Sequence, residues 1–208
     1  MQKIIFATGN AGKMKEIRAI LSDIRLQGSP AEILSMKEAG IDADIEENGR
    51  SFVENAVIKA KAAADASGEP GVIVLADDSG LEIDFLNKEP GIYSARYLGE
   101  HTSYHEKNGN LLERLKGVPQ QERTARFVCA IACVLPDGHL LTELATVEGF
   151  IGYEEKGENG FGYDPIFIVP AYGRTTAELT EEEKNEISHR GKALRAMKEQ
   201  LKQYYEKR

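Results

Sequence analysis

The most constraining feature of this chain is a short apolar run, Val72 to Ala76, that leads directly into Asp77-Asp78-Ser79-Gly80. A run of this length ending in a polar cluster predicts a buried strand that stops and delivers its acids to the edge of a sheet. Open α/β sheets bind ligands at such edges. Two neighbouring carboxylates repel each other unless a cation or a proton lies between them, so the cluster predicts a partner, and a hard divalent metal is the natural candidate.

Predicted strands and helices alternate along the chain. Ile4 to Ala7 predicts a first buried strand, and residues 24 to 35 predict a second. Capping boxes predict the starts of three helices: Ser51 with Glu54, Ser103 with Glu106, and Thr180 with Glu183. The first of these helices should run from Phe52 to about Ala66, and a last helix should carry its apolar side chains on one side.

An antiparallel part of the sheet is predicted near the middle of the chain. Pro136 to His139 is a strong hairpin signal between residues 124–135 and 140–147. Leu81, Ile83 and Phe85 alternate with acids, which predicts a half-solvated strand. No repeat or linker interrupts the pattern, so we expect an α/β fold with a single domain over residues 1–208.

Composition excludes some classes of function. The 208 residues are 41% apolar and 29% charged, which suits a well-packed globular chain. The balance of 34 acids against 26 bases gives a net charge of −8, which argues against a nucleic acid polymer held on a broad basic surface. No apolar stretch approaches the length of a membrane span or a signal segment, which favours a cytoplasmic location and no membrane partner.

Two metal patterns are weak. Cys129 and Cys133 lie in one apolar segment without a flanking histidine, so we expect reduced thiols in the core. His101 and His105 have the spacing of zinc ligands on a helix, but the glutamate of that motif is missing and a helix start lies between them.

A loop with two glycines and a lysine, Thr8-Gly9-Asn10-Ala11-Gly12-Lys13, lies between the first strand and its helix. Its backbone N–H groups could close around an anion at the helix N-terminus. The spacing does not match a P-loop, which needs four residues between its glycines and Ser or Thr after the lysine. The alternative is an ordinary tight turn with a solvated lysine.

Acids in two places could supply oxygen ligands to Mg²⁺. Glu46 and Glu47 lie in a polar loop, and Asp77 and Asp78 follow the buried run. Lys59, one helical turn after Asn55, could face the same anion as the loop lysine. The alternatives are solvated acids and a surface lysine.

Two later segments could contact a flat ring. Gly160-Phe161-Gly162-Tyr163-Asp164-Pro165 suits a loop that stacks on a ring and accepts a hydrogen bond from its edge, although packed turns have the same composition. Ser188-His189-Arg190 lies at the junction of two predicted helices, where it could donate to a carbonyl oxygen or simply break the helix.

Taken together, seven blocks resemble the inosine triphosphate pyrophosphatase family, a group of house-cleaning nucleotide hydrolases. They run in order from residue 3 to about residue 197: Thr8-Gly9-Asn10-x-x-Lys13, Glu47-x-Gly49, Phe52-x-Glu54-Asn55-Ala56-x-x-Lys59-Ala60, Ala76-Asp77-Asp78-Ser79-Gly80-Leu81, Pro90-Gly91-x-Tyr93-Ser94-Ala95-Arg96, Phe161-Gly162-Tyr163-Asp164-Pro165 and Ser188-His189-Arg190.

The resemblance implies a mixed α/β fold with an elongated central sheet flanked by helices, two lobes with a cleft between them, and a homodimer. It implies Mg²⁺-dependent hydrolysis of the noncanonical purine nucleoside triphosphates ITP, dITP and XTP to the monophosphate and pyrophosphate, by attack of water on the α-phosphorus. This activity would remove deaminated purines from the nucleotide pool.

Site residues are implied by position in the same way. The metal would be held by Glu47 and Asp78, and Asp78 is the favoured proton acceptor. The phosphates would be held by Thr8, Gly9, Asn10, Ala11, Gly12, Lys13, Lys59 and Ser79. The nucleotide, chiefly its base, would be received by Phe161, Gly162, Tyr163, Asp164, Lys184, His189 and Arg190. The division of roles between Glu46 and Glu47, and between Asp77 and Asp78, stays open at this point.

Overall fold

The computed structural model describes residues 2–206, and the chain divides into two compact units. Unit 1 contains residues up to 78, residues 129–145 and residues from 190 onward. Unit 2 contains residues 79–128 and 146–189. The single domain expected over residues 1–208 stays a prediction.

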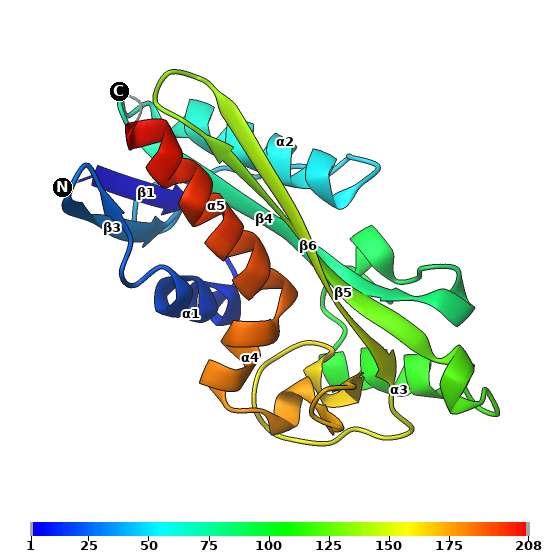
Figure 1. The fold of residues 1–208 in the computed structure, drawn as a ribbon. Coiled ribbons are helices and arrows are strands. Elements are labelled where there is room, and N and C mark those ends of the chain that lie inside the picture. The colour runs from blue at the N-terminus through cyan, green and yellow to red at the C-terminus, as the bar shows by residue number, and fades with distance from the viewer. Residues whose placement is uncertain (1, 207–208) are drawn as a thin grey trace. The chain divides into compact units, whose positions relative to one another are not determined.

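The strands of residues 2–206 form one eight-stranded sheet in the order β2-β3-β1-β4-β5-β6-β7-β8. Figure 1 labels β1, β3, β4, β5 and β6 of this sheet. Their bounds are β1 Gln2–Phe6, β2 Arg25–Leu26, β3 Ser29–Ser35, β4 Ile73–Ile83, β5 Thr124–Val134, β6 Leu140–Ile151, β7 Phe167–Val169 and β8 Arg174–Thr175. β1 pairs in parallel with β3 and with β4, whereas β7 pairs antiparallel with β6 and β8. The sheet is therefore mixed, which confirms the predicted fold class.

The α-helices of the described residues are α1 Ala11–Ile20, α2 Phe52–Ser67, α3 Tyr104–Arg114, α4 Glu181–Ile187 and α5 His189–Glu206. The capping boxes predicted for α3 and α4 are both complete. At α2 the Ser51 side chain accepts from the Glu54 N–H, but the Glu54 carboxylate accepts from the Arg50 N–H, so only half of that box forms. Within residues 2–206, no helix combines the length and apolar character needed to span a membrane.

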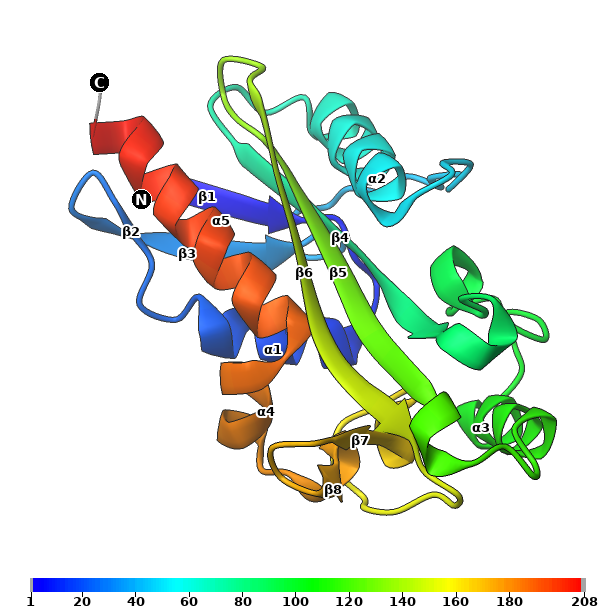
Figure 2. The same ribbon diagram turned by 45° about the vertical axis from the view of Figure 1, so that its right-hand side comes forward.

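In unit 1, α1 and α5 pack on one face of the strands. Ile4 and Phe6 of β1 and Ile73 and Leu75 of β4 point to this face and join a buried cluster with side chains of both helices. The intervening side chains, such as Val74, are also buried and point to the other face, because successive side chains of a strand alternate. The helix α2 lies along that other face (Figure 2), and its Ala56, Ala60 and Ala63 are fully buried.

Unit 2 has its own apolar core. It gathers the end of β4, the helix α3, parts of β5 and β6, and the chain around β7. Leu111 and Leu115 lie on the α3 side of this core, and Phe127 of β5 packs against Phe167 of β7 with ring centroids 4.4 Å apart. The core holds α3 and the segment before β7 in one folded unit.

Three local predictions are corrected. β4 does not stop at its acids but continues to Ile83. Phe85, expected on the buried side of a strand, lies in a short 3₁₀ turn over Asp84–Leu86 and is 47% exposed. Residues 24–35 hold two strands, because Gln27 and Gly28, with φ of 51° and 78°, close a two-residue hairpin. The hairpin between β5 and β6 is confirmed by the bond from the Leu135 N–H to the His139 carbonyl, 2.9 Å.

Candidate functional site

The strand β4 sends its two acids to opposite faces of unit 1. Adjacent residues of an extended strand point in opposite directions. Asp77 therefore meets Lys13 of α1 and Arg190 of α5, whereas Asp78 meets Lys59 of α2. The expectation that the two carboxylates share one cation is wrong, because the strand continues through them and gives each its own partners.

Asp78 belongs to a buried polar cluster with α2. The Lys59 ammonium lies 3.2 Å from Asp78 Oδ1 and 3.0 Å from Glu47 Oε1, so one cation joins the two carboxylates. Asn55, one turn before Lys59, donates to Asp78 Oδ2 at 3.2 Å and accepts from the Gly49 N–H at 2.8 Å. That second bond ties the polar loop to the helix. Glu46 is exposed, so Glu47 is the loop acid that faces Asp78.

The charges of this cluster follow from burial and proximity. Burial raises the pKa of the Asp78 carboxyl, Lys59 works against that rise, and the charge of Glu47 adds to it. Burial acts to lower the pKa of Lys59, but Asp78, Asp77 and Glu47 outweigh it and the pKa lies above its ordinary value. The cluster therefore combines a charged ammonium with a carboxylate that binds a proton more readily than an exposed aspartate.

Asp77 forms ion pairs on the other face of β4. Lys13 Nζ lies 3.0 Å from Asp77 Oδ2, and Arg190 Nη2 lies 3.2 Å from the same oxygen. The opposite side of the Arg190 guanidinium contacts Glu16 of α1 at 2.5 Å. Burial acts to raise the pKa of Asp77, but Lys13 and Arg190 hold it well below the usual range. Asp77 is thus a buried counter-ion that joins α1, β4 and α5.

The loop from Thr8 to Lys13 prepares a helix N-terminus. The helix begins at Ala11, earlier than expected, with Asn10 as its N-cap. Asn10 Oδ1 accepts from the Lys13 N–H at 3.0 Å, and Thr8 Oγ1 accepts from the Asn10 N–H at 3.2 Å. The first N–H groups of a helix have no acceptor within it. The N–H groups of Gly9, Ala11 and Gly12 are therefore the ones this loop can offer to an anion.

Glu47 and Asp78 fit Mg²⁺. This ion is usually bound through one or two protein carboxylates, with substrate phosphates and water completing its ligands. Both carboxylates supply hard oxygen donors, and they already accommodate one positive charge between them in the form of Lys59. Across residues 2–206, no group of three or more His, Cys, Asp or Glu side chains is arranged to hold a metal. A metal at this pair would therefore take further ligands from substrate and water.

In unit 2 the predicted aromatic loop is organised around Asp164. Its Oδ2 accepts from the Phe161 N–H at 2.8 Å and from Lys184 Nζ at 2.5 Å. Its Oδ1 accepts from Thr176 Oγ1 at 2.8 Å. The Lys184 ammonium also lies 4.8 Å from the centre of the Phe161 ring. An added Cβ at Gly160, where φ is +74°, would overlap the Asp164 carboxylate, so only glycine allows this closed loop.

The rest of the loop is held by α3 and by a neighbouring turn. Tyr163 is buried, its hydroxyl donates to the Ser94 carbonyl at 2.7 Å, and the Tyr104 ring meets it edge-on at 5.2 Å. The Gly162 carbonyl accepts from Asn108 Nδ2 at 3.3 Å. Unit 2 thus presents a loop whose backbone is fixed at several points.

The junction predicted at Ser188-His189-Arg190 is confirmed, since α4 ends at Ile187 and α5 begins at His189. His189 belongs to unit 2, is buried, and stacks on Phe127 with ring centroids 5.0 Å apart. Arg190 belongs to unit 1 and forms the pairs with Asp77 and Glu16 described above. Ser79 is half-buried within β4.

The predicted residues therefore come together in three groups. Unit 1 holds two of them on opposite faces of β4: Lys13 and Arg190 pair with Asp77, and Glu47 and Asp78 pair with Lys59. Unit 2 joins Phe161, Asp164 and Lys184 directly and places Gly162 and Tyr163 in the same loop.

Three contributors were missed as site residues: Glu16, Asn55 and Thr176. Glu16 lies three residues after Lys13 on α1, so helical spacing could have indicated it, whereas the spacing of Asn55 and Lys59 on α2 was used to assign a role to the lysine alone. Thr176 approaches Asp164 from 12 residues away and left no local signal.

The residues of the two weaker metal patterns have the following surroundings in the fold. Cys129 and Cys133 are buried free thiols, as predicted, and burial raises the pKa of each to about 12. His105 Nδ1 pairs with Glu155 Oε2 at 2.6 Å.

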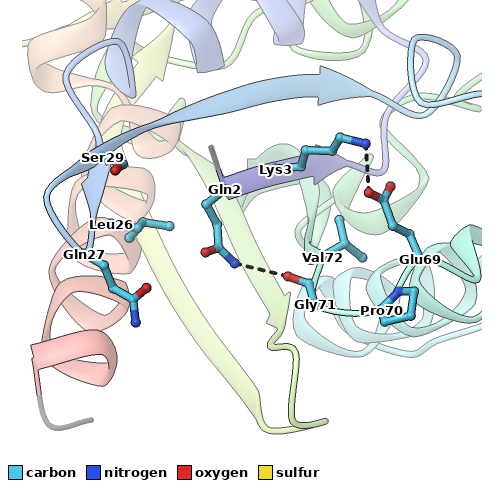
Figure 3. A pocket seen from close by; sticks show the side chains of 9 residues that line it. All are labelled: Gln2, Lys3, Leu26, Gln27, Ser29, Glu69, Pro70, Gly71 and Val72. Carbon is cyan, nitrogen blue, oxygen red and sulfur yellow. Dashed lines mark hydrogen bonds and ion pairs between the residues drawn. The ribbon is translucent and has the colours of Figure 1, made fainter.

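A surface hollow of about 340 Å³ lies in unit 1, lined by Gln2, Lys3 and Glu69 among others (Figure 3). Lys3 pairs with Glu69 across it at 2.8 Å, and Gln2 Nε2 donates to the Gly71 carbonyl at 3.1 Å. None of the predicted site residues lines this hollow.

Comparison with known proteins agrees with the motifs. The model of the Ham1 family matches residues 4–200. The chain is 49% identical over 205 residues to the dITP/XTP pyrophosphatase of Clostridium perfringens, covering 97% of this chain and 98% of that protein. The HAM1 protein of Coxiella burnetii has a solved structure that matches with a TM-score of 0.84 and 41% identity, covering 98% of this chain and 100% of that one.

A further solved structure, the nucleoside-triphosphatase or dITP/XTP pyrophosphatase of Mycobacterium abscessus, matches with a TM-score of 0.73 and 39% identity over 94% of this chain and 98% of that one. The fold and the family predicted from the motifs are both confirmed. With a match over nearly its whole length, the chain belongs to the Ham1 family.

Proposed function

We propose that this chain hydrolyses ITP, dITP and XTP to the monophosphate and pyrophosphate, as the names of its relatives describe for dITP and XTP. The observation that carries the proposal is the pair of carboxylates, Glu47 and Asp78, which both contact the Lys59 ammonium. Asn55, on the same helix as Lys59, donates a hydrogen bond to Asp78. Such a site offers oxygen ligands, a phosphate-binding cation and a buried base in one place. The activity would remove deaminated purines from the nucleotide pool.

Glu47 and Asp78 would hold Mg²⁺ together with the substrate phosphates. When bound there, the ion would supply Lewis acidity toward the phosphoryl oxygens and make a nearby water more acidic. Lys59, which pairs with both carboxylates, is the cation of this cluster that would contact a substrate phosphate.

Asp78 is the proposed proton acceptor for the water that attacks the α-phosphorus. A general base works best when its pKa approaches the working pH. In the metal-free protein, burial raises the pKa of Asp78 above its ordinary value, and the charge of a bound Mg²⁺ would oppose that rise. Asn55 donates to one carboxylate oxygen and thereby fixes the direction of the other.

The leaving pyrophosphate gains negative charge, and unit 1 offers positive charge to meet it. Lys13 and the N–H groups around Gly9 and Gly12 lie at the positive end of α1. Asp77 keeps Lys13 in place through its ion pair at 3.0 Å. We propose that Thr8 to Lys13, Lys59 and Ser79 bind the triphosphate and stabilise this charge.

We assign base selection to residues of unit 2. Hypoxanthine presents an O6 acceptor and an N1–H donor, and adenine presents the reverse pattern. Donors such as Lys184 or His189 would suit O6, and against adenine each orphaned buried group costs about 1 to 3 kcal/mol. Asp164, expected as the acceptor for the base, already accepts from Lys184 and Thr176, so its carboxylate also fixes the loop that carries Phe161.

Arg190 is proposed as a further contact of the nucleotide. Its guanidinium is paired with Asp77 and Glu16, which hold the side chain in one position. Arg190→Ala is expected to narrow the ratio of ITP to ATP turnover, and an unchanged ratio would count against this contact.

The experiment that tests the function is a pyrophosphate-release assay with ITP, dITP, XTP, ATP and GTP, with and without Mg²⁺. We expect release from the deaminated purines that stops with EDTA and returns with Mg²⁺. Two rivals give other results: a phosphotransferase moves labelled phosphate to an acceptor, and a nucleotide sensor binds without turnover. We also propose a homodimer, which sedimentation at equilibrium would test, and a cytoplasmic location.

A further inference from the structure

A buried amide on α3 contacts the aromatic loop of unit 2. Asn108 is 1% exposed, and its Nδ2 donates to Glu155 Oε1 at 2.7 Å and to the Gly162 carbonyl at 3.3 Å. Both partners are acceptors, so the amide cannot be turned over without losing both bonds. The orientation of the side chain is therefore fixed by its surroundings.

The other end of the amide indicates what the side chain is for. Asn108 Oδ1 is buried and has no hydrogen-bond partner among residues 2–206. A buried acceptor without a partner destabilises a fold, and an apolar residue of similar shape would avoid that cost. The asparagine is therefore best understood through the bonds of its nitrogen and not through packing.

The hydrogen bond from Asn108 matters because two glycines of this loop would otherwise give its backbone a large conformational freedom. Gly160 and Gly162 have φ of +74° and +71°, on either side of Phe161, and glycine has the largest conformational freedom of any residue. The N–H of Phe161 is held by Asp164 Oδ2 from within the loop at 2.8 Å. The Gly162 carbonyl is held from outside the loop by Asn108. These two bonds fix the backbone before and after the Phe161 side chain.

We propose that Asn108 is a positioning residue for purine recognition: it fixes the Gly162 carbonyl and thereby the direction in which Phe161 is presented. Glu155 holds the amide in place, and its second oxygen is bound by His105 at 2.6 Å. The inference rests on the proposed function, in which the loop from Phe161 to Asp164 receives the base. It adds a residue of α3 that touches neither base nor phosphate.

Three variants separate positioning from folding. Asn108→Asp replaces the donor by an acceptor, so it loses both bonds and places two carboxylates together. Glu155→Gln alone keeps an oxygen that can accept from Asn108. When the two changes are combined, the new amide at position 155 can donate to the new carboxylate at position 108. This double variant restores the side-chain pair but leaves the Gly162 carbonyl without its donor.

The matched control is Asn110→Asp, on the same helix. Asn110 Oδ1 accepts from the Tyr97 hydroxyl at 2.7 Å, and an aspartate keeps that acceptor while adding the same charge. The measurements are KM and kcat for ITP, the inhibition constant of inorganic pyrophosphate, and the thermal midpoint. Pyrophosphate probes the phosphate side without a base.

We expect the double variant to recover the thermal midpoint lost in Asn108→Asp while its KM for ITP stays raised by about 5- to 10-fold. Its kcat and its inhibition by pyrophosphate should stay near those of the wild type, as should all values of Glu155→Gln and Asn110→Asp. A KM that recovers together with the midpoint would overturn the proposal, because the amide would then serve folding alone.

If Asn108→Asp does not fold, Asn108→Ser tests the proposal in its place, because the serine side chain is too short to reach the Gly162 carbonyl. A wild-type KM for ITP in Asn108→Ser would overturn the proposal. A wild-type protein that releases no pyrophosphate from ITP would refute the proposed function and not this inference alone. Normal wild-type turnover with an unchanged KM in the variants would refute only the inference.

Discussion

Asp77→Asn is the substitution with the clearest expected effect on stability. The change keeps the shape of the side chain but removes the charge that lies between Lys13 and Arg190. Arg190 is 2% exposed and keeps one carboxylate, Glu16, at 2.5 Å. Lys13 loses its ion pair with Asp77, but its side chain is 17% exposed and can reach water.

The expected loss of stability follows from what each cation keeps after the substitution. Removing one partner of a buried ion pair costs about 3 to 5 kcal/mol, because a charge is left uncompensated in the interior. Since both cations keep some compensation, we expect the lower end, about 3 kcal/mol. For a chain of this size that corresponds to a fall of about 6 to 12 °C in the thermal midpoint.

The assay is urea and thermal unfolding of the metal-free protein, with Asp23→Asn as the matched control. Asp23 pairs with Lys198, which also lies on α5, but its side chain is 73% exposed. Ion pairs that face water contribute little. We therefore expect the control to unfold at nearly the wild-type midpoint.

The pH dependence of stability gives a second test of the ion pairs of Asp77. The pKa of Asp77 is lower in the folded protein than its ordinary value of 3.8. Its contribution is therefore complete above that value and is lost as the pH falls toward the folded pKa, since the unfolded chain then binds the proton more tightly. The stability gap between wild type and Asp77→Asn should be constant near neutral pH and narrow below pH 3.8. The reasoning would be refuted if Asp77→Asn lost no more stability than Asp23→Asn. It would also be refuted if the stability difference between wild type and Asp77→Asn did not change below pH 3.8.

Three further predictions concern the site, the thiols and the glycines. Asp78→Asn is expected to lower ITP turnover by orders of magnitude while calorimetric nucleotide binding persists; near-normal turnover would remove Asp78 from its role. Cys129 and Cys133, with pKa values raised to about 12, should resist a thiol reagent at pH 8 until denaturant is added, and labelling of the folded protein would contradict their burial. Gly157→Ala, with φ of +86° and an added Cβ that overlaps facing backbone, should cost about 3 kcal/mol in urea unfolding. Gly109→Ala, with open space on α3, should stabilise by about 0.5 to 1 kcal/mol, and equal effects of the two changes would show that the clash was misjudged.

Local signals predicted the helices and the hairpin because their causes are local. Ser103 with Glu106 and Thr180 with Glu183 satisfy the first N–H groups of α3 and α4 within four residues of sequence. Gly68, with φ of +56°, ends α2 where the sequence placed its end. What failed was the end of β4, because acids are rare within a buried strand and the partners that make them acceptable lie on helices far away in the chain.

The candidate site shows the same limit. Motifs identified Lys59 and Asp78 as members of one site, but only the fold shows that their side chains meet at 3.2 Å. Likewise, the hydrogen bond from Thr176 to Asp164 depends on a turn that brings the two together, and no spacing rule predicts it. Sequence patterns give the residue types that a reaction needs, whereas their pairing depends on which faces of the strands the helices cover.

The alternation of β4 explains why adjacent acids can differ in chemistry. Asp77 faces α1 and α5, whose lysine and arginine lower its pKa and keep it ionised. Asp78 faces α2, where burial raises its pKa and a single lysine is shared with Glu47. One strand therefore separates a permanent counter-ion from a carboxylate that can exchange a proton. An insertion or deletion of one residue in β4 before the acids would send each acid to the opposite face of the sheet. We therefore expect such a change to prevent folding. Replacing either acid alone by its isosteric amide should leave the fold intact.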